Sequence, residues 1–454
     1  MKKSLYCCLL ALLLQPSSAA LAQLSFSQRV VKDNLFIPWE LVYGPDDHLW
    51  FTQKNGYVCR LDPVSGQLDT IYHEAQSVII GEGGMLGMAL HPNFASDPYV
   101  FIAYEYNEGS LYKERVVKYR FTGGTLQMPQ ILIDGIQGAM IHNGCRLVIV
   151  DDKLFVSTGD ASNAPLAQDV AFLNGKILRI NLDGSIPADN PIPGNAIWSW
   201  GHRNAQGLAE HNGVLYSSEH GPANDDELNI IKKGRNYGWP NVQGFCDQPG
   251  EMQYCADSNI VEPLYAWTPT LAVSGIEYYN HPMFPGLANS ILMTTLKDNS
   301  LYQLQLNAAG DSITNVTKLP GINYGRLRDI AVAPDGRIFI STSNSNASDD
   351  GPRVDQIIEL YDPATTGISG LPTDNNTLLV YPNPAIDLMN IAFLESGMDG
   401  QQWRYTVTDM QGQVVMEDRL EFNSLHVGGL YPGIYILKMW NEKNEMVYRR
   451  FVKW

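Results

Sequence analysis

The sequence predicts an all-β protein, a six-bladed β-propeller followed by a small C-terminal β-sandwich. Three observations support this prediction. Long stretches with helical periodicity are scarce. One pattern recurs instead through residues 39–344: an apolar strand, a two-residue turn, a second strand and a polar loop. A change of composition near residue 365 separates this region from a short series of alternating apolar and polar segments.

The hairpin pattern occurs in six places. Four copies carry an Asp-Asp, Asn-Gly or Asp-Gly turn: WELVYGPDDHLWFTQ from Trp39, CRLVIVDDKLFVSTGD from Cys145, QGLAEHNGVLYSSEHG from Gln206 and RDIAVAPDGRIFISTSN from Arg328. Two looser copies begin at Met85 and Val273. Repeated hairpins of one kind are typical of a propeller, and a sandwich or β-helix built from similar hairpins is the alternative. In a propeller the loops STGDASN, SSEHGPANDDE and STSNSN would share one mouth of the central channel.

The N-terminal segment predicts export. Residues 1–22 place two lysines before a short apolar run and small residues, the order of a secretory signal peptide cleaved after Ala22. No later stretch reaches the roughly 18 apolar residues of a spanning helix, so we expect no transmembrane segment. The predicted domains are the propeller at 23–364, a linker at 365–377 rich in Thr, Gly, Asn and Ser, and the sandwich at 378–454.

Charge and cysteine content restrict the partners. The net charge of −17 argues against nucleic acid and anionic membranes as partners.

Four cysteines follow the predicted signal peptide. Cys246 and Cys255 are near neighbours in a loop-like segment, so they are candidates for a disulfide in an oxidising compartment. Cys59 and Cys145 lie in strand-like runs and are expected to be buried. No Cys or His spacing indicates zinc.

Several polar residues could carry chemistry. His142 with Asp160 on the next strand could be a base and its orienting partner, although a lone histidine is often only structural. Arg326 and Arg328 alternate on an extended segment, so both point to one side and suggest an anionic ligand, unless they form a solvated face. Lys297 in TLKDNS is a weaker cation candidate. The turn EHGPANDDE combines bent backbone with carboxylates, as a calcium site or an ordinary surface turn would.

Six motifs together resemble the glucose/sorbosone dehydrogenase family of soluble, pyrroloquinoline quinone-dependent aldose dehydrogenases. They are GEGGMLGMALHPNF, HNGCRLVI with STGD, GHRNAQGLA with SEHGPANDDELN, KKGRNYGWP, TLKD and GRLRDIAVAPDG. They occur in order from about residue 35 to about residue 360. The resemblance implies a six-bladed propeller.

The resemblance also implies roles for individual residues. His142 would be the general base, Asp160 would orient it, and Arg203 would stabilise negative charge on the quinone. The other cofactor contacts would be Asn204, Thr270, Lys297, Arg326 and Arg328. Gly221 and Pro222 would offer backbone carbonyls to a catalytic Ca²⁺, and Glu227 would bind a second, structural Ca²⁺. Glu82 stands where the best-known glucose dehydrogenases have a substrate-side Gln, so we expect it to face the substrate.

The C-terminal region resembles the sorting domain of type IX secretion cargo. The matching features are VYPNP at 380–384, a Met-Gln-Gly turn, the run LYPGIYIL and the basic end RRFVKW. This resemblance implies contact with the secretion machinery and a secreted or cell-surface location.

The sequence as a whole therefore predicts an exported quinoprotein that oxidises the C1 hydroxyl of aldose sugars to lactones, with an unknown electron acceptor. Two alternatives remain open. One is a sugar- or protein-binding propeller without the chemistry, since fold alone does not fix function. The other is a calcium-dependent lactonase on a similar propeller, which would need converging carboxylates.

Overall fold

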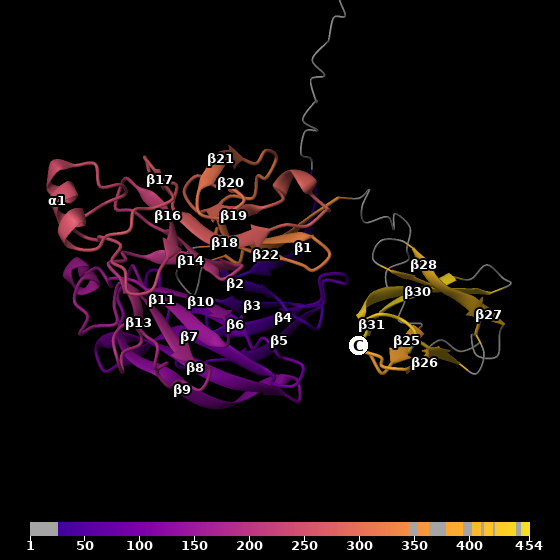
Figure 1. Cartoon of the computed structure of the whole chain (residues 1–454). Helices are drawn as coiled ribbons and strands as arrows, with labels where there is room; N and C mark the ends of the chain where they lie inside the picture. The colour runs from indigo at the N-terminus through magenta and orange to yellow at the C-terminus, as the bar shows by residue number, and fades with distance from the viewer. Residues whose placement is uncertain are drawn as a thin grey trace, which may run out of the picture.

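The computed structural model describes residues 26–345, 352–362, 378–393, 402–409, 413–420, 423–441 and 446–454 (Figure 1). This part of the chain is all-β, with one α-helix, α1 (Pro249–Asp257), and two short 3₁₀ helices. None of these helices is long and apolar enough to cross a membrane. The predicted signal peptide at 1–22 and linker at 365–377 lie outside the described residues.

Five four-stranded antiparallel sheets are built from consecutive strands. They are β2 (Pro38–Tyr43), β3 (Leu49–Gln53), β4 (Tyr57–Leu61) and β5 (Leu68–His73); β6 (Met85–Leu90), β7 (Tyr99–Glu108), β8 (Leu111–Thr122) and β9 (Thr125–Gln137); β10 (Gly144–Val150), β11 (Lys153–Thr158), β12 (Lys176–Asn181) and β13 (Ile197–Trp200); β14 (Ala205–His211), β15 (Val214–Glu219), β16 (Asp226–Ile231) and β17 (Tyr265–Trp267); and β18 (Val273–Tyr279), β19 (Ser290–Thr295), β20 (Leu301–Leu306) and β21 (Ile313–Lys318).

A sixth sheet joins the two ends of this region. It contains β22 (Leu327–Val332), β23 (Ile338–Thr342) and β24 (Asp355–Tyr361), and its outer strand is β1 (Ser27–Leu35) from the N-terminal side. The first strands of the six sheets contact one another in cyclic order, β2 to β6, β10, β14, β18, β22 and back to β2. The six sheets therefore surround a common axis.

Burial along each sheet follows this arrangement. All six residues of β19 are buried, and so are all five residues of β3 and β23. The last strands, such as β5 and β21, are mostly exposed or half-buried. Strands that are covered on both faces need nearly continuous apolar sequence, whereas outer strands tolerate polar residues.

The predicted hairpin turns are present at two of the sites named. Asp151 and Asp152 join β10 to β11 with φ of 48° and 55°, and Asn212 and Gly213 join β14 to β15 with φ of 50° and 78°. Positive φ at both central residues is the conformation that short hairpins favour, and Asp, Asn and Gly adopt it at the lowest cost.

A buried ion network ties three first strands together near the axis. Arg146 of β10 lies 2.7 Å from Glu40 of β2 and 2.9 Å from Asp329 of β22, and its Nε donates to the Gln206 carbonyl at 2.9 Å. Its guanidinium also stacks 4.3 Å from the Trp39 ring. Because Glu40, Asp329 and Gln206 come from three different sheets, these contacts help to fix the geometry of the axis.

The C-terminal region forms two further sheets. One contains β25 (Leu378–Tyr381), β26 (Leu388–Phe393) and β29 (Ser424–His426). The other contains β27 (Trp403–Asp409), β28 (Val414–Arg419), β30 (Gly433–Asn441) and β31 (Met446–Lys453). They share one hydrophobic cluster that includes Met389, Trp403, Leu437 and Phe451.

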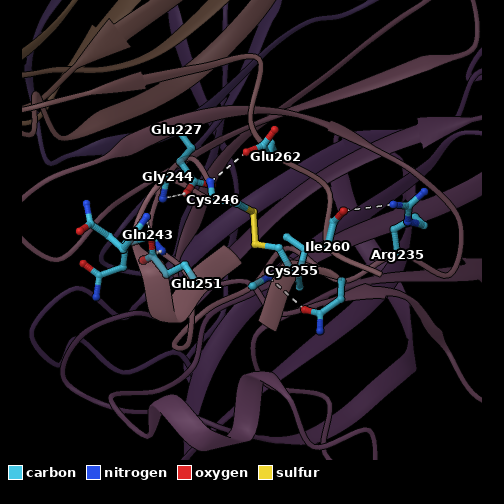
Figure 2. Close-up of a disulfide and its surroundings, with 12 residues drawn as sticks. Glu227, Arg235, Gln243, Gly244, Cys246, Glu251, Cys255, Ile260 and Glu262 are labelled. Atoms are coloured by element: carbon cyan, nitrogen blue, oxygen red, sulfur yellow. Dashed lines mark hydrogen bonds between the residues drawn. A yellow bond between two sulfur atoms is a disulfide. The ribbon is translucent and has the colours of Figure 1, made fainter. Parts of the chain in front are cut away.

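The cysteines follow the sequence prediction. Cys246 and Cys255 form a disulfide with a Cα–Cα distance of 6.4 Å, as predicted, and it ties the loop before α1 to the helix (Figure 2). In the described part of the chain, Cys59 and Cys145 are unbonded and buried, also as predicted.

Candidate active site

A cavity of about 500 Å³ lies where the six sheets meet. Every sheet contributes to its lining from its first strand or the residue just before that strand: Trp39, Leu86, Gly144, Gln206, Ala272 and Arg328. Lys54, in the loop between β3 and β4, and Glu82 and Arg326, in loops between sheets, add further polar groups. The volume is within the range of pockets for small molecules and cofactors, roughly 300–1,000 Å³.

His142 and Asp160 form a hydrogen-bonded pair beside this cavity. His142 Nδ1 lies 2.8 Å from Asp160 Oδ1. The Asp160 carboxylate also accepts from the Trp239 indole at 2.8 Å and from the backbone N–H of Ser162 at 2.8 Å. A carboxylate can only accept when ionised, so Nδ1 donates and Nε2 is the ring nitrogen that can take a proton.

The backbone around His142 is tightly constrained. His142 has a φ of 66°, in the left-handed region that non-glycine residues disfavour. A Cβ on Gly159 would lie 1.7 Å from the His142 carbonyl oxygen, so only glycine fits there. Glu82 Oε2 accepts the His142 backbone N–H at 2.9 Å. Glu82 is exposed and lines the cavity, so it lies next to both the pair and the space for a ligand.

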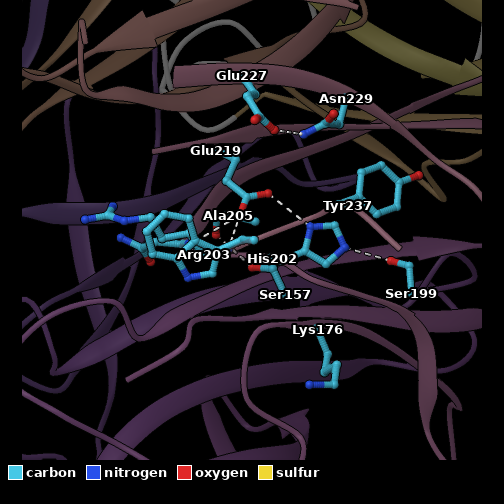
Figure 3. Close-up of polar contacts among 12 residues, drawn as sticks. Ser157, Lys176, Ser199, His202, Arg203, Ala205, Glu219, Glu227, Asn229 and Tyr237 are labelled. Carbon is cyan, nitrogen blue, oxygen red and sulfur yellow. Dashed lines mark hydrogen bonds and ion pairs between the residues drawn. The ribbon is translucent and has the colours of Figure 1, made fainter. Parts of the chain in front are cut away.

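Glu219 holds the segment that carries Arg203 and Asn204 (Figure 3). Its Oε1 accepts the backbone N–H groups of both residues, the one from Asn204 at 3.2 Å. Its Oε2 lies 3.0 Å from His202 Nδ1, and the His202 ring stacks 4.5 Å from Tyr237. One buried carboxylate thus fixes the three consecutive residues that precede β14.

Arg203 and Asn204 leave buried donors without partners in the described structure. Arg203 donates to the His220 carbonyl at 3.2 Å and lies 5.3 Å from the Trp239 ring, but its Nε has no hydrogen-bond partner. Asn204 Oδ1 accepts from Gly144 N at 3.2 Å and from Gln206 Nε2 at 3.0 Å, and its Nδ2 has no partner. Burying an unpaired donor is costly, which indicates a missing acceptor.

Arg326 and Arg328 line the same cavity. Arg328 donates to Gln206 Oε1 at 3.0 Å, and its Nε is a third buried donor without a partner. Arg326 donates to two backbone carbonyls, those of Ser343 at 3.1 Å and Leu296 at 3.3 Å. Burial, with repulsion from Arg326 and Arg146, lowers the pKa of Arg328 to about 10. Within the described ranges neither guanidinium forms an ion pair with a carboxylate, so an anion would relieve their repulsion.

Lys297 and Thr270 lie outside this cavity. Lys297 is exposed, and its Nζ donates to Thr270 Oγ1 at 3.1 Å. Thr270 N in turn donates to the Ala223 carbonyl at 3.3 Å, which places the pair next to the Gly221–Pro222 turn. Leu296, the neighbour of Lys297 in sequence, does line the cavity.

The Gly221–Pro222 turn borders a second, smaller hollow of about 20 Å³. Its lining includes Arg203 and Glu227, and it shares His220 with the central cavity. A Cβ on Gly221 would lie 1.9 Å from the Asn224 carbonyl oxygen, so the turn requires glycine. The Asp226 carboxylate accepts from Gly221 N at 2.9 Å, so it braces the turn rather than pointing at a cation.

Glu227 is a half-buried residue that lines this hollow. It accepts from Gly244 N (Figure 2) and from Asn229 Nδ2 (Figure 3), each at 2.9 Å. Burial and the nearby Glu219 raise its pKa to about 8. In the described part of the chain, no three His, Cys, Asp or Glu side chains converge on a metal position. A calcium ion at the turn would therefore depend mainly on backbone carbonyls.

Sequence reasoning missed several residues of the site. Lys54 lines the cavity directly after β3, in a loop equivalent to those that were singled out. Trp239 lies in the quoted motif KKGRNYGWP, but nothing in the sequence indicated its bond to Asp160. Gln206 and His220 also line the cavity, from within motifs whose neighbouring residues were chosen instead.

The comparisons with known proteins agree with this geometry. Residues 35–351 match the glucose/sorbosone dehydrogenase family, and residues 379–453 match the secretion system C-terminal sorting domain. Quinoprotein glucose dehydrogenase B of Acinetobacter calcoaceticus is 31% identical, over 74% of this chain and 90% of that protein. Aldose sugar dehydrogenase YliI of Escherichia coli is also 31% identical, over 70% of this chain and 90% of that protein.

Two solved structures extend the comparison. The PQQ-bound aldose sugar dehydrogenase of Streptomyces coelicolor is 31% identical, with a TM-score of 0.63, over 74% of this chain and 98% of that one. The soluble aldose sugar dehydrogenase of Escherichia coli in its apo-form is 27% identical, with a TM-score of 0.64, over 74% and 99% of the two chains. The chain described here belongs to the glucose/sorbosone dehydrogenase family.

Proposed function

We propose that this protein is a quinoprotein oxidoreductase that oxidises the C1 hydroxyl of aldose sugars to lactones, using pyrroloquinoline quinone (PQQ) and Ca²⁺. The observation that carries the proposal is that three unpaired buried donors lie close to the hydrogen-bonded His142–Asp160 pair. Arg328 lines the central cavity, Arg203 lines the adjoining hollow, and Asn204 accepts from Gly144 of the cavity lining. The relatives named as quinoprotein or PQQ-bound sugar dehydrogenases support it.

We also interpret the architecture in these terms. The six four-stranded sheets with cyclic contacts are the blades of a six-bladed propeller, within the predicted range 23–364. The two C-terminal sheets with one shared core form a small β-sandwich, within 378–454. In this arrangement the cavity is the propeller's central channel, where loops from every blade can act on one ligand.

The residues around the cavity fit an anionic, planar cofactor. Arg326 and Arg328 lack carboxylate partners in the described ranges and would neutralise its carboxylates, with Lys297 and Thr270 at the edge. The unpaired donors of Arg203 and Asn204 would face its polar atoms. Gly221 and Pro222 would offer backbone carbonyls to a Ca²⁺, and Glu227 would serve a second one. When bound, PQQ supplies the two-electron acceptor for hydride from C1, and Ca²⁺ supplies charge that polarises it.

His142 and Asp160 would accept and stabilise the proton. The C1 hydroxyl proton passes to Nε2 of His142, and Asp160 stabilises the resulting imidazolium through Nδ1. The proton and the hydride together account for the two hydrogens lost as the hemiacetal becomes a lactone. Glu82, at the cavity edge, can accept hydrogen bonds from sugar hydroxyls. An external electron acceptor must then remove the two electrons.

Reconstitution tests this proposal. The purified protein is incubated with PQQ and CaCl₂, cofactor binding is followed by absorbance, and dye reduction is measured on a panel of aldoses. We expect saturable PQQ binding and sugar-dependent dye reduction that both fall when a chelator removes Ca²⁺. Absence of PQQ binding would overturn the proposal, and binding without turnover on any sugar would favour a propeller that only binds ligands.

We further propose export. The signal-like segment 1–22 would direct the chain across the inner membrane, and the sorting domain would pass it to the type IX secretion machinery for release or surface attachment. Intact-mass analysis of protein from medium and cell surface would test both steps. A mature N-terminus other than Gln23 would contradict the predicted cleavage.

A further inference from the structure

Lys54 is a buried cation of the cavity to which the proposed reaction assigns no role. It is 4% exposed, and its Nζ donates to the Gly81 carbonyl at 2.5 Å. This is the one hydrogen bond recorded for that ammonium within the described ranges. The charges of Glu82 and Glu105 attract the ammonium, while burial and the nearby Arg328 disfavour it and lower its pKa to about 8. Burying an ammonium with a single carbonyl partner costs free energy of folding, which suggests that the contact has a function.

The loop that Lys54 contacts packs closely against Lys54 and Glu105. Met85 N donates to the Lys54 carbonyl at 3.0 Å. A Cβ on Gly84 would lie 2.5 Å from that carbonyl and 2.7 Å from the Lys54 Cγ. A Cβ on Gly83 would lie 1.3 Å from Glu105 Oε2. The segment Gly81–Gly84 therefore fits only because its glycines allow close packing, and Lys54 holds both of its ends.

The same loop reaches the proposed base. Glu82 N donates to the Met140 carbonyl at 2.7 Å, and a Cβ on Gly81 would lie 1.9 Å from that oxygen. Glu82 Oε2 accepts the His142 N–H at 2.9 Å. Because His142 has a left-handed φ of 66°, its backbone needs such contacts to stay in place.

We propose that Lys54 and Glu82 are positioning residues that together clamp the backbone of His142: Lys54 fixes the Gly81–Gly84 loop, and Glu82 carries that constraint to the His142 N–H. The benefit to catalysis rests on the proposed function, whereas the clamp itself is a property of the protein alone. The main role of Glu82 is then to hold the backbone of His142, in addition to any contact with the sugar.

Hydrogen exchange tests the clamp without any reaction. Exchange at residues 78–84 and 138–143 is measured by mass spectrometry on the full chain without added cofactor. In Lys54→Met we expect exchange in both segments to rise about tenfold, the effect of losing a charge-assisted hydrogen bond. Lys54→Arg, which keeps a cationic donor, should stay closer to wild type. Lys232→Met removes an exposed lysine and should change neither segment.

A second variant covers the case in which Lys54→Met does not fold. Glu82 is exposed, so Glu82→Ala should fold, and it removes the acceptor of the His142 N–H. We expect faster exchange at 138–143 in this variant. Unchanged exchange at 138–143 in either variant would overturn the clamp.

Kinetics separate positioning from cofactor binding. With PQQ and Ca²⁺ bound, Lys54→Met should lower kcat about tenfold while the Kd for PQQ stays within about twofold. Weaker PQQ binding with unchanged exchange would mean that Lys54 is a charge partner of the cofactor, and would overturn the proposal. If wild-type protein oxidises no sugar, the proposed function fails, and the exchange data alone still decide whether the clamp exists.

Discussion

Asp160 Oδ1 and His142 Nδ1 lie 2.8 Å apart because they flank one hairpin. In the β10–β11 register Gly144 pairs with Thr158, so His142, two residues before the pair, faces Asp160, two residues after it. The hairpin therefore places a histidine and a carboxylate partner together beside the central cavity.

This pair predicts the result of removing the base. In His142→Ala we expect turnover to fall at least about 100-fold, because no group remains to take the hydroxyl proton. PQQ affinity should change little, since the arginines of the cavity are intact. Steady-state dye reduction and a PQQ titration measure both quantities. The control is His73→Ala, which alters an exposed histidine of β5. Full turnover in His142→Ala would remove this residue from the mechanism.

Arg326 predicts an effect on binding instead. Its guanidinium lines the cavity and donates only to backbone carbonyls, so Arg326→Gln removes a charge without breaking an ion pair of the described structure. We expect the Kd for PQQ to rise at least about tenfold, the typical contribution of a hydrogen bond to a charged group. Turnover at saturating PQQ should fall less. Equilibrium titration measures the Kd, with the exposed Arg120→Gln as control. Equal affinities would refute the anionic ligand.

Glu105 predicts how stability depends on pH. Burial raises its pKa from the usual 4.5 to about 8. The folded state thus binds more protons than the unfolded state between these values, so this group's contribution to the free energy of unfolding is complete below about pH 4.5 and is lost as pH rises to about 8. The slope is at most about 1.4 kcal/mol per pH unit.

Glu105→Gln should therefore gain stability relative to wild type as pH rises from 5 to 8, because a neutral amide loses no proton. It can still accept from Asn143 Nδ2, which now lies 3.1 Å from Glu105 Oε2. Urea unfolding at both pH values measures the effect. The exposed Glu108→Gln serves as the matched control. A constant difference between wild type and Glu105→Gln would mean that Glu105 ionises normally.

The Cys246–Cys255 disulfide closes a short loop, with the two residues 9 positions apart. Loop-closure entropy then limits its contribution to about 2–3 kcal/mol of unfolding free energy. The free energy of unfolding of the double variant Cys246→Ser, Cys255→Ser should be lower than that of wild type by up to this amount. Added reductant should not destabilise the double variant further. Thermal and urea unfolding give the value. Gly244, in the same loop, donates from its N–H to Glu227 at 2.9 Å. We therefore also expect the double variant to bind Ca²⁺ more weakly at the proposed Glu227 site. An unchanged Ca²⁺ titration would show that the loop does not support that site.

Features that depend on short stretches of chain could be predicted from the amino-acid sequence. Alternation and turn chemistry gave the strands and the hairpin turns at Asp151–Asp152 and Asn212–Gly213, because these act over a few residues. The His142–Asp160 pair follows from one such hairpin, and the disulfide joins near neighbours.

Contacts between residues far apart in the chain become visible only in the folded protein. Arg328 bonds to Gln206 from 122 positions away, and Glu82 reaches the His142 N–H from 60 positions away. The sequence motifs also did not show that Lys297 and Thr270 lie beside the Gly221–Pro222 turn, or that Lys54 lines the cavity. The reason is physical: the contacts among the first strands set how each sheet is oriented toward the common axis, and no local pattern encodes that orientation.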